Sequence, residues 1–95
     1  MAFEWHSKKA ARNLKDHGVS FDEAATIFDD PFQVHYPDDA HSFGEQRYIC
    51  LGFSNQGRLL MLAYTEPVPD TFHIITAREV TRREQREYES QRNLT

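Results

Sequence analysis

Residues 47–65 read Arg-Tyr-Ile-Cys-Leu-Gly-Phe-Ser-Asn-Gln-Gly-Arg-Leu-Leu-Met-Leu-Ala-Tyr-Thr, which is two apolar runs joined by a polar turn sequence. In the first run, residues 47, 49, 51 and 53 share one face, as is typical of a β-strand. The second run, residues 59–65, is apolar almost throughout, which predicts a strand at the centre of a sheet. The turn at residues 54–57 contains glycine and is short enough to connect neighbouring strands. The stretch therefore predicts the middle of a mainly antiparallel sheet.

Strand signals continue on both sides of this pair. Residues 3–5 predict an edge strand, and residues 32–36 and 72–78 predict two further strands. Proline and aspartate at residues 37–39 and 67–70 supply the turns. The period of the apolar residues changes from that of helices to that of strands after residue 31, so the helices lie mainly towards the N-terminus.

Three helices complete the pattern. The first covers residues 7–15, with Ala10, Ala11 and Leu14 on one face, and ends at Gly18. The second begins with the capping-box sequence of residues 20–23, and its apolar positions recur through residue 28 until a proline ends it. The third begins with the capping box of residues 81–84. It is strongly polar, and its main apolar anchor is Tyr88.

The order β-α-α-β-β-β-β-α predicts an α+β fold with a mainly antiparallel sheet, two N-terminal helices and one C-terminal helix. A length of 95 residues fits a single domain covering residues 1–95. The longest apolar run is far shorter than the roughly 20 residues that span a bilayer, and residues 1–6 do not form a secretory signal. We therefore expect a cytoplasmic protein without a membrane partner.

Several common kinds of functional site are excluded. The four glycines are isolated, so there is no glycine-rich phosphate loop, and no Gly-x-Ser-x-Gly sequence occurs. The single cysteine, Cys50, excludes an internal disulfide and a zinc-thiolate site. Because Cys50 lies in an apolar strand, where a thiolate is disfavoured, it is interpreted as a buried structural residue.

The charge of −4 is unevenly distributed along the chain. No lysine or arginine occurs between Asp16 and Gln46, whereas eight acidic residues fall in the span 16–45. The eleven basic residues lie before and after this segment. A fold that gathers both basic ends on one face would allow contact with phosphates, despite the negative total. Ordinary solvated faces are the alternative interpretation.

A local cluster of Asp38, Asp39, His41 and Glu45 admits three interpretations. Its oxygen and nitrogen atoms are suitable ligands for a divalent cation, which leaves a metal-dependent hydrolase open. Turns are also rich in aspartate for backbone hydrogen bonding alone. Because imidazole changes charge near neutral pH, His41 is a candidate general base as well.

Arg47 and Arg78 lie at the beginning and end of predicted strands, where side chains project from a rigid sheet. Phosphoryl transfer needs fixed cations of this kind, because a guanidinium group donates two hydrogen bonds to the developing charge. It also needs an acid and a base, for which His41, Glu45, Glu66 and His73 are available. The alternative is a structural ion pair at the sheet edge, such as Arg78 with Glu66.

An ordered set of landmarks extends from residue 3 to residue 88. They are Phe3-Glu4-Trp5, Lys8-Lys9-Ala10, Asn13, His17-Gly18-Val19-Ser20-Phe21-Asp22-Glu23-Ala24, Phe28-Asp29-Asp30, His41, Glu45-Gln46-Arg47-Tyr48, Gly52, Leu59-Leu60, Tyr64-Thr65-Glu66, Ile74-Ile75-Thr76-Ala77-Arg78, Thr81, Glu84 and Tyr88. In this order the chain resembles the BrnT family of type II toxin–antitoxin ribonucleases, which have a RelE-like fold.

The resemblance implies a small toxin that cleaves RNA without a metal or other cofactor and halts translation. It also implies neutralisation by a BrnA-type ribbon-helix-helix antitoxin, whose dimer would join two toxins in a heterotetramer. Operator DNA would be contacted only through the antitoxin. Either the acidic surface of residues 22–45 or a cleft formed by the basic residues would bind this partner, and the sequence does not choose between them.

Carried over by position, the resemblance implies two sets of site residues. The catalytic set is His41, Glu45, Arg47, Glu66 and Arg78, and the RNA-binding set is Lys15, His17, His73, Arg82 and Tyr88, with no metal ligand. In this mechanism the ribose 2′-hydroxyl attacks the adjacent phosphate in line. Arg47 and Arg78 stabilise the transition state, His41 or Glu45 accepts the proton, and Glu66 orients an arginine.

Two positions depart from the family pattern. Pro67 follows Glu66 where the pattern has arginine, and His73 replaces the arginine that commonly precedes the Ile-Ile pair. Losing a permanent cation weakens phosphate binding at neutral pH, although an imidazole can also donate a proton. The alternative function is therefore a weakened binding module that acts only as antitoxin partner and co-repressor.

Overall fold

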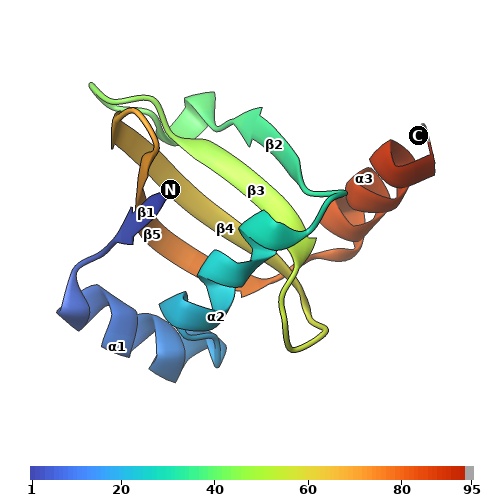
Figure 1. Ribbon diagram of the computed structural model, residues 1–95, viewed down its shortest axis with the longest axis horizontal. Helices are drawn as coiled ribbons and strands as arrows, with labels where there is room; N and C mark the ends of the chain where they lie inside the picture. The colour runs from blue at the N-terminus through green and yellow to red at the C-terminus, as the bar shows by residue number, and fades with distance from the viewer. Residues whose placement is uncertain (94–95) are drawn as a thin grey trace.

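The two strands predicted at the centre of the sheet, β3 (Tyr48–Phe53) and β4 (Leu59–Val68), form an antiparallel hairpin in the computed structural model, which describes residues 1–93. The sheet has five strands in the order β1-β5-β4-β3-β2, which confirms the α+β fold with β4 in the middle (Figure 1). The remaining elements are β1 (Ala2–Glu4), α1 (Ser7–His17), α2 (Phe21–Ala25), η1 (Thr26–Asp29), β2 (Val34–Pro37), η2 (Asp39–His41), β5 (Thr71–Glu79) and α3 (Arg82–Asn93).

Pairing is antiparallel except at one edge, where the short strand β1 runs parallel to β5. β4 is longer than expected, because Pro67 and Val68 belong to the strand and the turn is confined to residues 69–70. The strand accommodates Pro67 because its pairing with β5 is irregular between Thr65 and Val68, where a missing N–H interrupts no regular ladder. None of the helices within residues 1–93 has the length and apolar character that crossing a bilayer requires.

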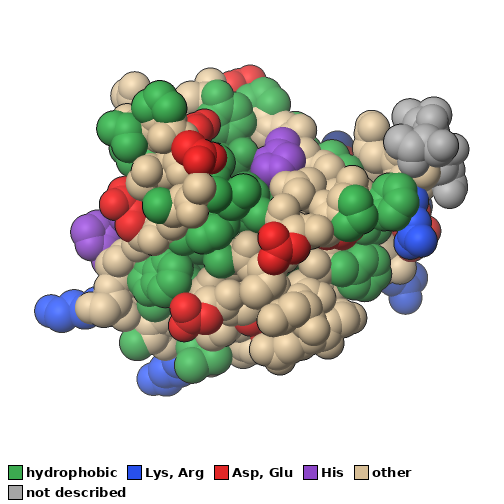
Figure 2. Space-filling view, viewed as in Figure 1, with side chains coloured by type: hydrophobic (Ala, Val, Ile, Leu, Met, Phe, Trp, Pro, Cys, Tyr) green, Lys and Arg blue, Asp and Glu red, His purple; other side chains and the backbone are tan. Residues whose placement is uncertain are grey.

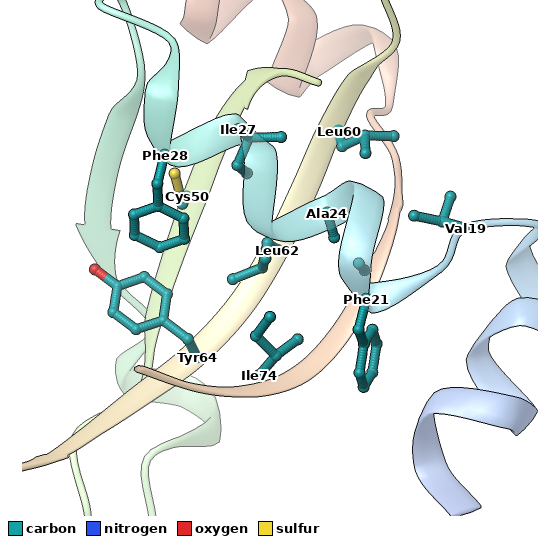
Figure 3. Packing of buried hydrophobic residues seen from close by; sticks show 11 residues of the cluster. Val19, Phe21, Ala24, Ile27, Phe28, Cys50, Leu60, Leu62, Tyr64 and Ile74 are labelled. Atoms are coloured by element: carbon teal, nitrogen blue, oxygen red, sulfur yellow. The ribbon is translucent and has the colours of Figure 1, made fainter. Parts of the chain in front are cut away.

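One face of the sheet packs against α1, α2 and η1. Apolar side chains of α2 and η1, including Phe21, Ile27 and Phe28, lie over those of β3, β4 and β5 (Figure 3). Cys50 is buried here, as predicted. Gly52 permits the close approach of η1, since a Cβ atom at this position would lie 3.1 Å from the carbonyl oxygen of Ile27. A larger residue at position 52 would force the two layers apart.

The buried face of α1 differs from the prediction. Leu14 is 52% exposed, whereas Asn13 is only 6% exposed. The Nδ2 atom of Asn13 donates to the carbonyl oxygens of Val19 and Ala77, both at 2.9 Å, and its Oδ1 accepts from Ala77 N at 3.1 Å. β1 pairs only with the beginning of β5, so Ala77 has no strand partner on that side. The amide of Asn13 replaces the missing strand and satisfies these backbone groups.

Both predicted capping boxes occupy helix N-termini, but only the second is reciprocal. At the start of α3, Thr81 Oγ1 accepts from Glu84 N at 3.2 Å, and Glu84 Oε1 accepts from Thr81 N at 2.8 Å. At the start of α2, Ser20 Oγ accepts from Glu23 N at 3.0 Å. The Glu23 carboxylate instead binds Arg58 and Ser54, because it is buried against the β3–β4 turn.

α3 packs on the opposite face of the sheet through Tyr88, which confirms this residue as the helix anchor. Its hydroxyl donates to Asp30 Oδ2 at 2.6 Å, and the same oxygen accepts from Phe53 N at 2.8 Å. Burial opposes ionisation of Asp30, but these hydrogen bonds hold its pKa below the ordinary value. Asp30 thus links α3 to the end of β3 and to the loop after η1.

Replacing Tyr88 with phenylalanine should lower the free energy of unfolding by about 1.5–2 kcal/mol, because a hydrogen bond to a charged carboxylate is lost while the ring remains. Urea denaturation followed by circular dichroism measures this change. The control is Tyr48→Phe, since no hydrogen bond to the Tyr48 hydroxyl is formed within residues 1–93. Equal effects of the two substitutions would show that the bond to Asp30 does not stabilise α3.

Candidate active site

A cavity of about 370 Å³ opens on the face of the sheet that α3 only partly covers. Its floor consists of Tyr36, Ile49, Ala63 and Thr76, which are cross-strand partners on the four adjacent strands β2, β3, β4 and β5. Because these side chains come from paired positions, they lie on the same face of the sheet. The floor is mostly apolar, while the charged residues of the cavity stand around its rim.

Arg78 projects from β5 at one side of this floor, two residues beyond Thr76. Its guanidinium group forms a bidentate ion pair with Glu84 at the start of α3, with N–O distances of 2.8 and 3.0 Å. Burial opposes ionisation of Glu84, but its hydrogen bonds from Arg78 and Thr81 lower its pKa below the ordinary value. The same pairing raises the pKa of Arg78. The two guanidinium N–H groups that would donate to a phosphate therefore donate to the Glu84 carboxylate.

Arg47, Asp38 and His41 stand at another side of the floor. Asp38 Oδ1 lies 3.0 Å from Nδ1 of His41, and Asp38 Oδ2 lies 3.9 Å from Nε of Arg47. The Nε atom of Arg47 is buried, and no hydrogen-bond acceptor for it lies among residues 1–93. A buried N–H without a hydrogen bond is unusual, and here the Asp38 carboxylate supplies the neighbouring negative charge.

The loop between β2 and β3 fixes the backbone from which Asp38 and Arg47 project. Asp38 N donates to Arg47 O at 2.8 Å, which continues the pairing of the two strands beyond their ends. The hydroxyl of Ser42 donates to Asp38 O at 2.7 Å and its oxygen accepts from Arg47 N at 2.8 Å. The backbone of residues 38 and 47 is therefore tied at two points, so both side chains leave it from defined positions.

Comparison with known proteins identifies the family of the chain. The family model described as "Ribonuclease toxin, BrnT, of type II toxin-antitoxin system" matches residues 5–84. The chain belongs to the BrnT family. A crystal structure of the Brucella abortus ribonuclease toxin BrnT is similar, with a TM-score of 0.66 and 15% identity over 86% of this chain and 99% of that chain. Among curated proteins no sequence matches.

Within this BrnT-family chain, the cavity brings together three residues of the predicted catalytic set, namely Arg47, Arg78 and His41. Glu45 and Glu66 do not line it. Glu45 lies in the exposed loop before β3, and Glu66 accepts a hydrogen bond from Asp70 N at 2.7 Å near the β4–β5 turn. The alternative of a structural ion pair at Arg78 is confirmed in kind, although its partner is Glu84 and not Glu66.

The predicted RNA-binding residues do not form one surface. Tyr88 is 2% exposed, so its ring belongs to the core and is not available to RNA. His73 lies near β1, 3.4 Å from Glu4, at the other end of β5 from Arg78. Lys15 and His17 lie in the last turn of α1, beyond the edge of the sheet. None of these residues lines the cavity, and neither does Arg82, which is exposed on α3, although His17 shares a separate pocket with Thr76 of the cavity floor.

The basic residues of the BrnT-family chain are carried by elements on both faces of the sheet. α1 packs beside β5 on the face covered by α2, while α3 packs on the opposite face. Figure 2 shows the α2 face, where the lysine and arginine side chains lie at the margins. Lys9 and Arg12 of α1 share a pocket with Thr76, which also lines the cavity of Arg47 and Arg78, so the gathering of basic residues on one face stays a prediction.

The acidic cluster around residue 38 also differs from one expectation. Within residues 1–93, no three histidine, cysteine, aspartate or glutamate side chains come together as a metal-binding set, so the ligand set considered at Asp38, Asp39 and His41 does not form. Asp38 instead holds His41 and faces Arg47. The sequence alone does not indicate this role, because an aspartate in a turn sequence is already explained as a turn former or metal ligand. Glu84 was missed because the capping box already explained it.

Proposed function

We propose that this BrnT-family chain is an endoribonuclease that cleaves RNA without a metal ion at the cavity of Arg47 and Arg78. The 2′-oxygen of a ribose attacks the adjacent phosphorus while its proton passes to His41. The bond from phosphorus to the 5′-oxygen breaks, and the departing oxygen takes a proton from water. The products are a 2′,3′-cyclic phosphate and a 5′-hydroxyl end.

The observation that carries this proposal is that His41 and Arg47, from the segment between β2 and β3, line the same cavity as Arg78 from the distant strand β5. Guanidinium groups stabilise the charge that develops on the phosphoryl oxygens. Arg47 makes no hydrogen bond through Nε within residues 1–93, and its ion pair with Asp38 is long, at 3.9 Å. Asp38 orients the imidazole through Nδ1, which leaves Nε2 to accept a proton.

The test uses purified chain and a fluorescently labelled RNA in EDTA. We expect cleavage that the chelator does not reduce, with products that carry 2′,3′-cyclic phosphate ends by mass spectrometry. A substrate with a single 2′-deoxyribose at the cleavage position should resist, because the attacking oxygen is absent. Loss of cleavage in EDTA, or cleavage at the deoxyribose, would contradict the mechanism.

Replacing Asp38 with asparagine should lower the cleavage rate by roughly 10- to 100-fold, because His41 loses the charge that orients it. The rate should fall mainly through kcat, since Asp38 does not bind substrate directly. The measurement compares kcat and KM across pH 5–9 for both proteins.

The His41→Ala chain supplies the control for this prediction. In that background, Asp38→Asn should have little further effect, because the group that Asp38 positions is already gone. An undiminished effect of Asp38→Asn without His41 would assign Asp38 to the support of Arg47 instead.

The family also supports a partner proposal. A BrnA-type ribbon-helix-helix antitoxin would neutralise the toxin as a dimer that joins two toxin chains in the cytoplasm, and the free toxin would halt translation. Co-expression followed by size-exclusion chromatography with light scattering tests the heterotetramer. Operator DNA should bind to the complex and not to the toxin alone.

The alternative of a weakened co-repressor was motivated by Pro67 and His73. Neither Pro67 nor His73 lines the cavity, which keeps Arg47, Arg78 and His41 without them. Expression without antitoxin separates the two functions. We expect arrest of growth and of protein synthesis, relieved by Arg78→Ala. Normal growth with undiminished expression would favour the co-repressor.

A further inference from the structure

A second cavity, of about 730 Å³, forms a groove between α3 and the segment that leads into β2. Residues 31–36 line one wall, and one side of α3, residues 83–92, lines the other. β2 is an edge strand of the sheet, so this groove lies at the margin of the domain. None of the residues proposed above for catalysis lines it.

The groove and the active-site cavity adjoin at Tyr36, which lines both. Glu84 of α3 stands at the cavity, and Arg83 and Arg86 of the same helix stand in the groove. A polymer with one phosphate between Arg47 and Arg78 would therefore pass Tyr36 and enter the groove.

The groove carries cations that the fold does not use for packing. Arg83 and Arg86 are three residues apart and therefore lie on the same side of α3, and both are exposed. Arg83 makes an exposed pair with Glu87 at 3.6 Å, and no ion pair to Arg86 forms within residues 1–93. Pairs of this kind contribute little to stability, so both arginines are free to exchange partners with a phosphate.

An aromatic surface accompanies these cations. Phe32 is exposed in the opposite wall, and the guanidinium carbon of Arg92 lies 5.0 Å from its ring centroid. A cationic groove with an accessible aromatic ring is the combination that binds single-stranded nucleic acid, because phosphates contact the cations while bases stack on the ring. An acidic peptide would form ion pairs with the arginines, but it would have no base to stack on the ring of Phe32.

We propose that the groove between α3 and β2 binds the single-stranded RNA that flanks the scissile phosphate. Arg83 and Arg86 contact its backbone phosphates, and Phe32 stacks on one of its bases. This inference rests on the proposed function, since it takes the substrate to be RNA. It adds a substrate-binding surface outside the cavity that sets how much of the RNA strand the protein contacts.

The test measures binding and not cleavage, so that it is independent of the chemical step. Fully 2′-O-methylated RNAs of about 12 and about 3 nucleotides, which cannot be cut, are titrated by fluorescence anisotropy. The variant Arg83→Glu/Arg86→Glu is compared with Lys8→Glu/Arg12→Glu, which makes the same charge change on α1. Phe32→Ala tests the stacking, and circular dichroism verifies that each variant is folded.

We expect the long RNA to bind the groove variant at least about tenfold more weakly, with a salt slope shallower by about 1.4 for two lost phosphate contacts. The advantage of the long RNA over the short one should largely disappear, and the α1 variant should keep it. Phe32→Ala should weaken long-RNA binding without changing the salt slope.

Equal weakening by the α1 variant would overturn the proposal, because the effect would then reflect total charge. Unchanged affinity of the groove variant would overturn it as well, and so would a polyglutamate peptide that displaces the long RNA from the same arginines. Failure of the nuclease proposal would be seen differently, as undiminished cleavage by Arg78→Ala. The binding measurements would still be interpretable, because they use RNA that cannot be cut.

Discussion

Replacing Arg78 with alanine is expected to lower the rate of RNA cleavage by about 100- to 1000-fold, the usual effect of removing one fixed donor to a developing oxyanion. Arg78 projects from β5, and its guanidinium group lies at the rim of a cavity with an apolar floor. In such surroundings, a charged hydrogen bond is worth more than in water. Single-turnover cleavage with saturating protein measures the chemical step directly.

The ion pair with Glu84 complicates the interpretation of Arg78→Ala, since the substitution also removes a link between β5 and α3. Glu84→Gln is the matched control, because it removes the charge pair and keeps the arginine. We expect this variant to bind RNA more tightly, because a phosphate no longer competes with a carboxylate for the guanidinium fork. A loss of cleavage as large as that of Arg78→Ala would show that the ion pair, and not the cation, matters.

The strands were predictable because their signals are local. Residues 59–65 carry apolar side chains on both faces of the strand, and β4 indeed lies in the middle of a sheet that is covered on both faces. The alternation in β3 was equally informative, since Leu51 and Ile49 belong to the α3 face while Cys50 belongs to the α2 face. Periodicity reports which side chains share a face, and it needs no knowledge of the partner strand.

The role of Asn13 was not predictable in the same way. A helix pattern assigns polar residues to solvent, so Leu14 was placed on the buried side. Asn13 is buried because the end of β5 has no neighbouring strand, and that vacancy depends on β1 being short and parallel. Such a requirement arises only after distant segments have packed.

The candidate site was likewise predictable only where the signals are local. The positions of Arg47 and Arg78 at strand ends predicted that both would project from the sheet, and they line one cavity. Glu45 and Glu66 were candidates because the resemblance carries them over and because a carboxylate can act as an acid or a base, but Glu45 lies in the loop before β3 and Glu66 lies near the β4–β5 turn, so neither lines the cavity. Asp38 and Glu84 act across segments, and both carried a sufficient local explanation as turn and cap residues.

Replacing Arg58 with alanine is expected to lower the free energy of unfolding at pH 7 by about 3 kcal/mol, because it leaves the Glu23 carboxylate buried without its counter-ion. The side chain of Glu23 is only 3% exposed. Arg58 donates to it through Nε at 3.0 Å and through a second guanidinium nitrogen, which also donates to Gly18 O at 3.0 Å. Together these contacts join α2, the end of α1 and the β3–β4 turn.

The pH dependence gives this prediction a definite sign. The hydrogen bond from Arg58, assisted by one from Ser54, holds the pKa of Glu23 below its ordinary value of 4.5, against the effect of burial. The pair therefore stabilises the fold fully above pH 4.5, and its contribution is lost as the pH falls through the lowered pKa of the folded state. Without Arg58, burial raises the pKa, so the carboxyl of the variant is more readily protonated when folded. The difference between the two proteins should shrink as the pH falls below 4.5.

Two variants distinguish this explanation from a general loss of packing. Arg12→Ala removes an exposed pair with Asp16, whose N–O distance is 3.5 Å, and should change the unfolding free energy by less than about 1 kcal/mol. Adding Glu23→Gln to Arg58→Ala removes the unpaired charge and should recover part of the lost stability, because an amide is cheaper to bury than a carboxylate. If the double variant is no more stable than Arg58→Ala, and the difference from the unchanged protein is the same at pH 4 and pH 7, then the arginine stabilises the fold through its aliphatic contacts and not through its charge.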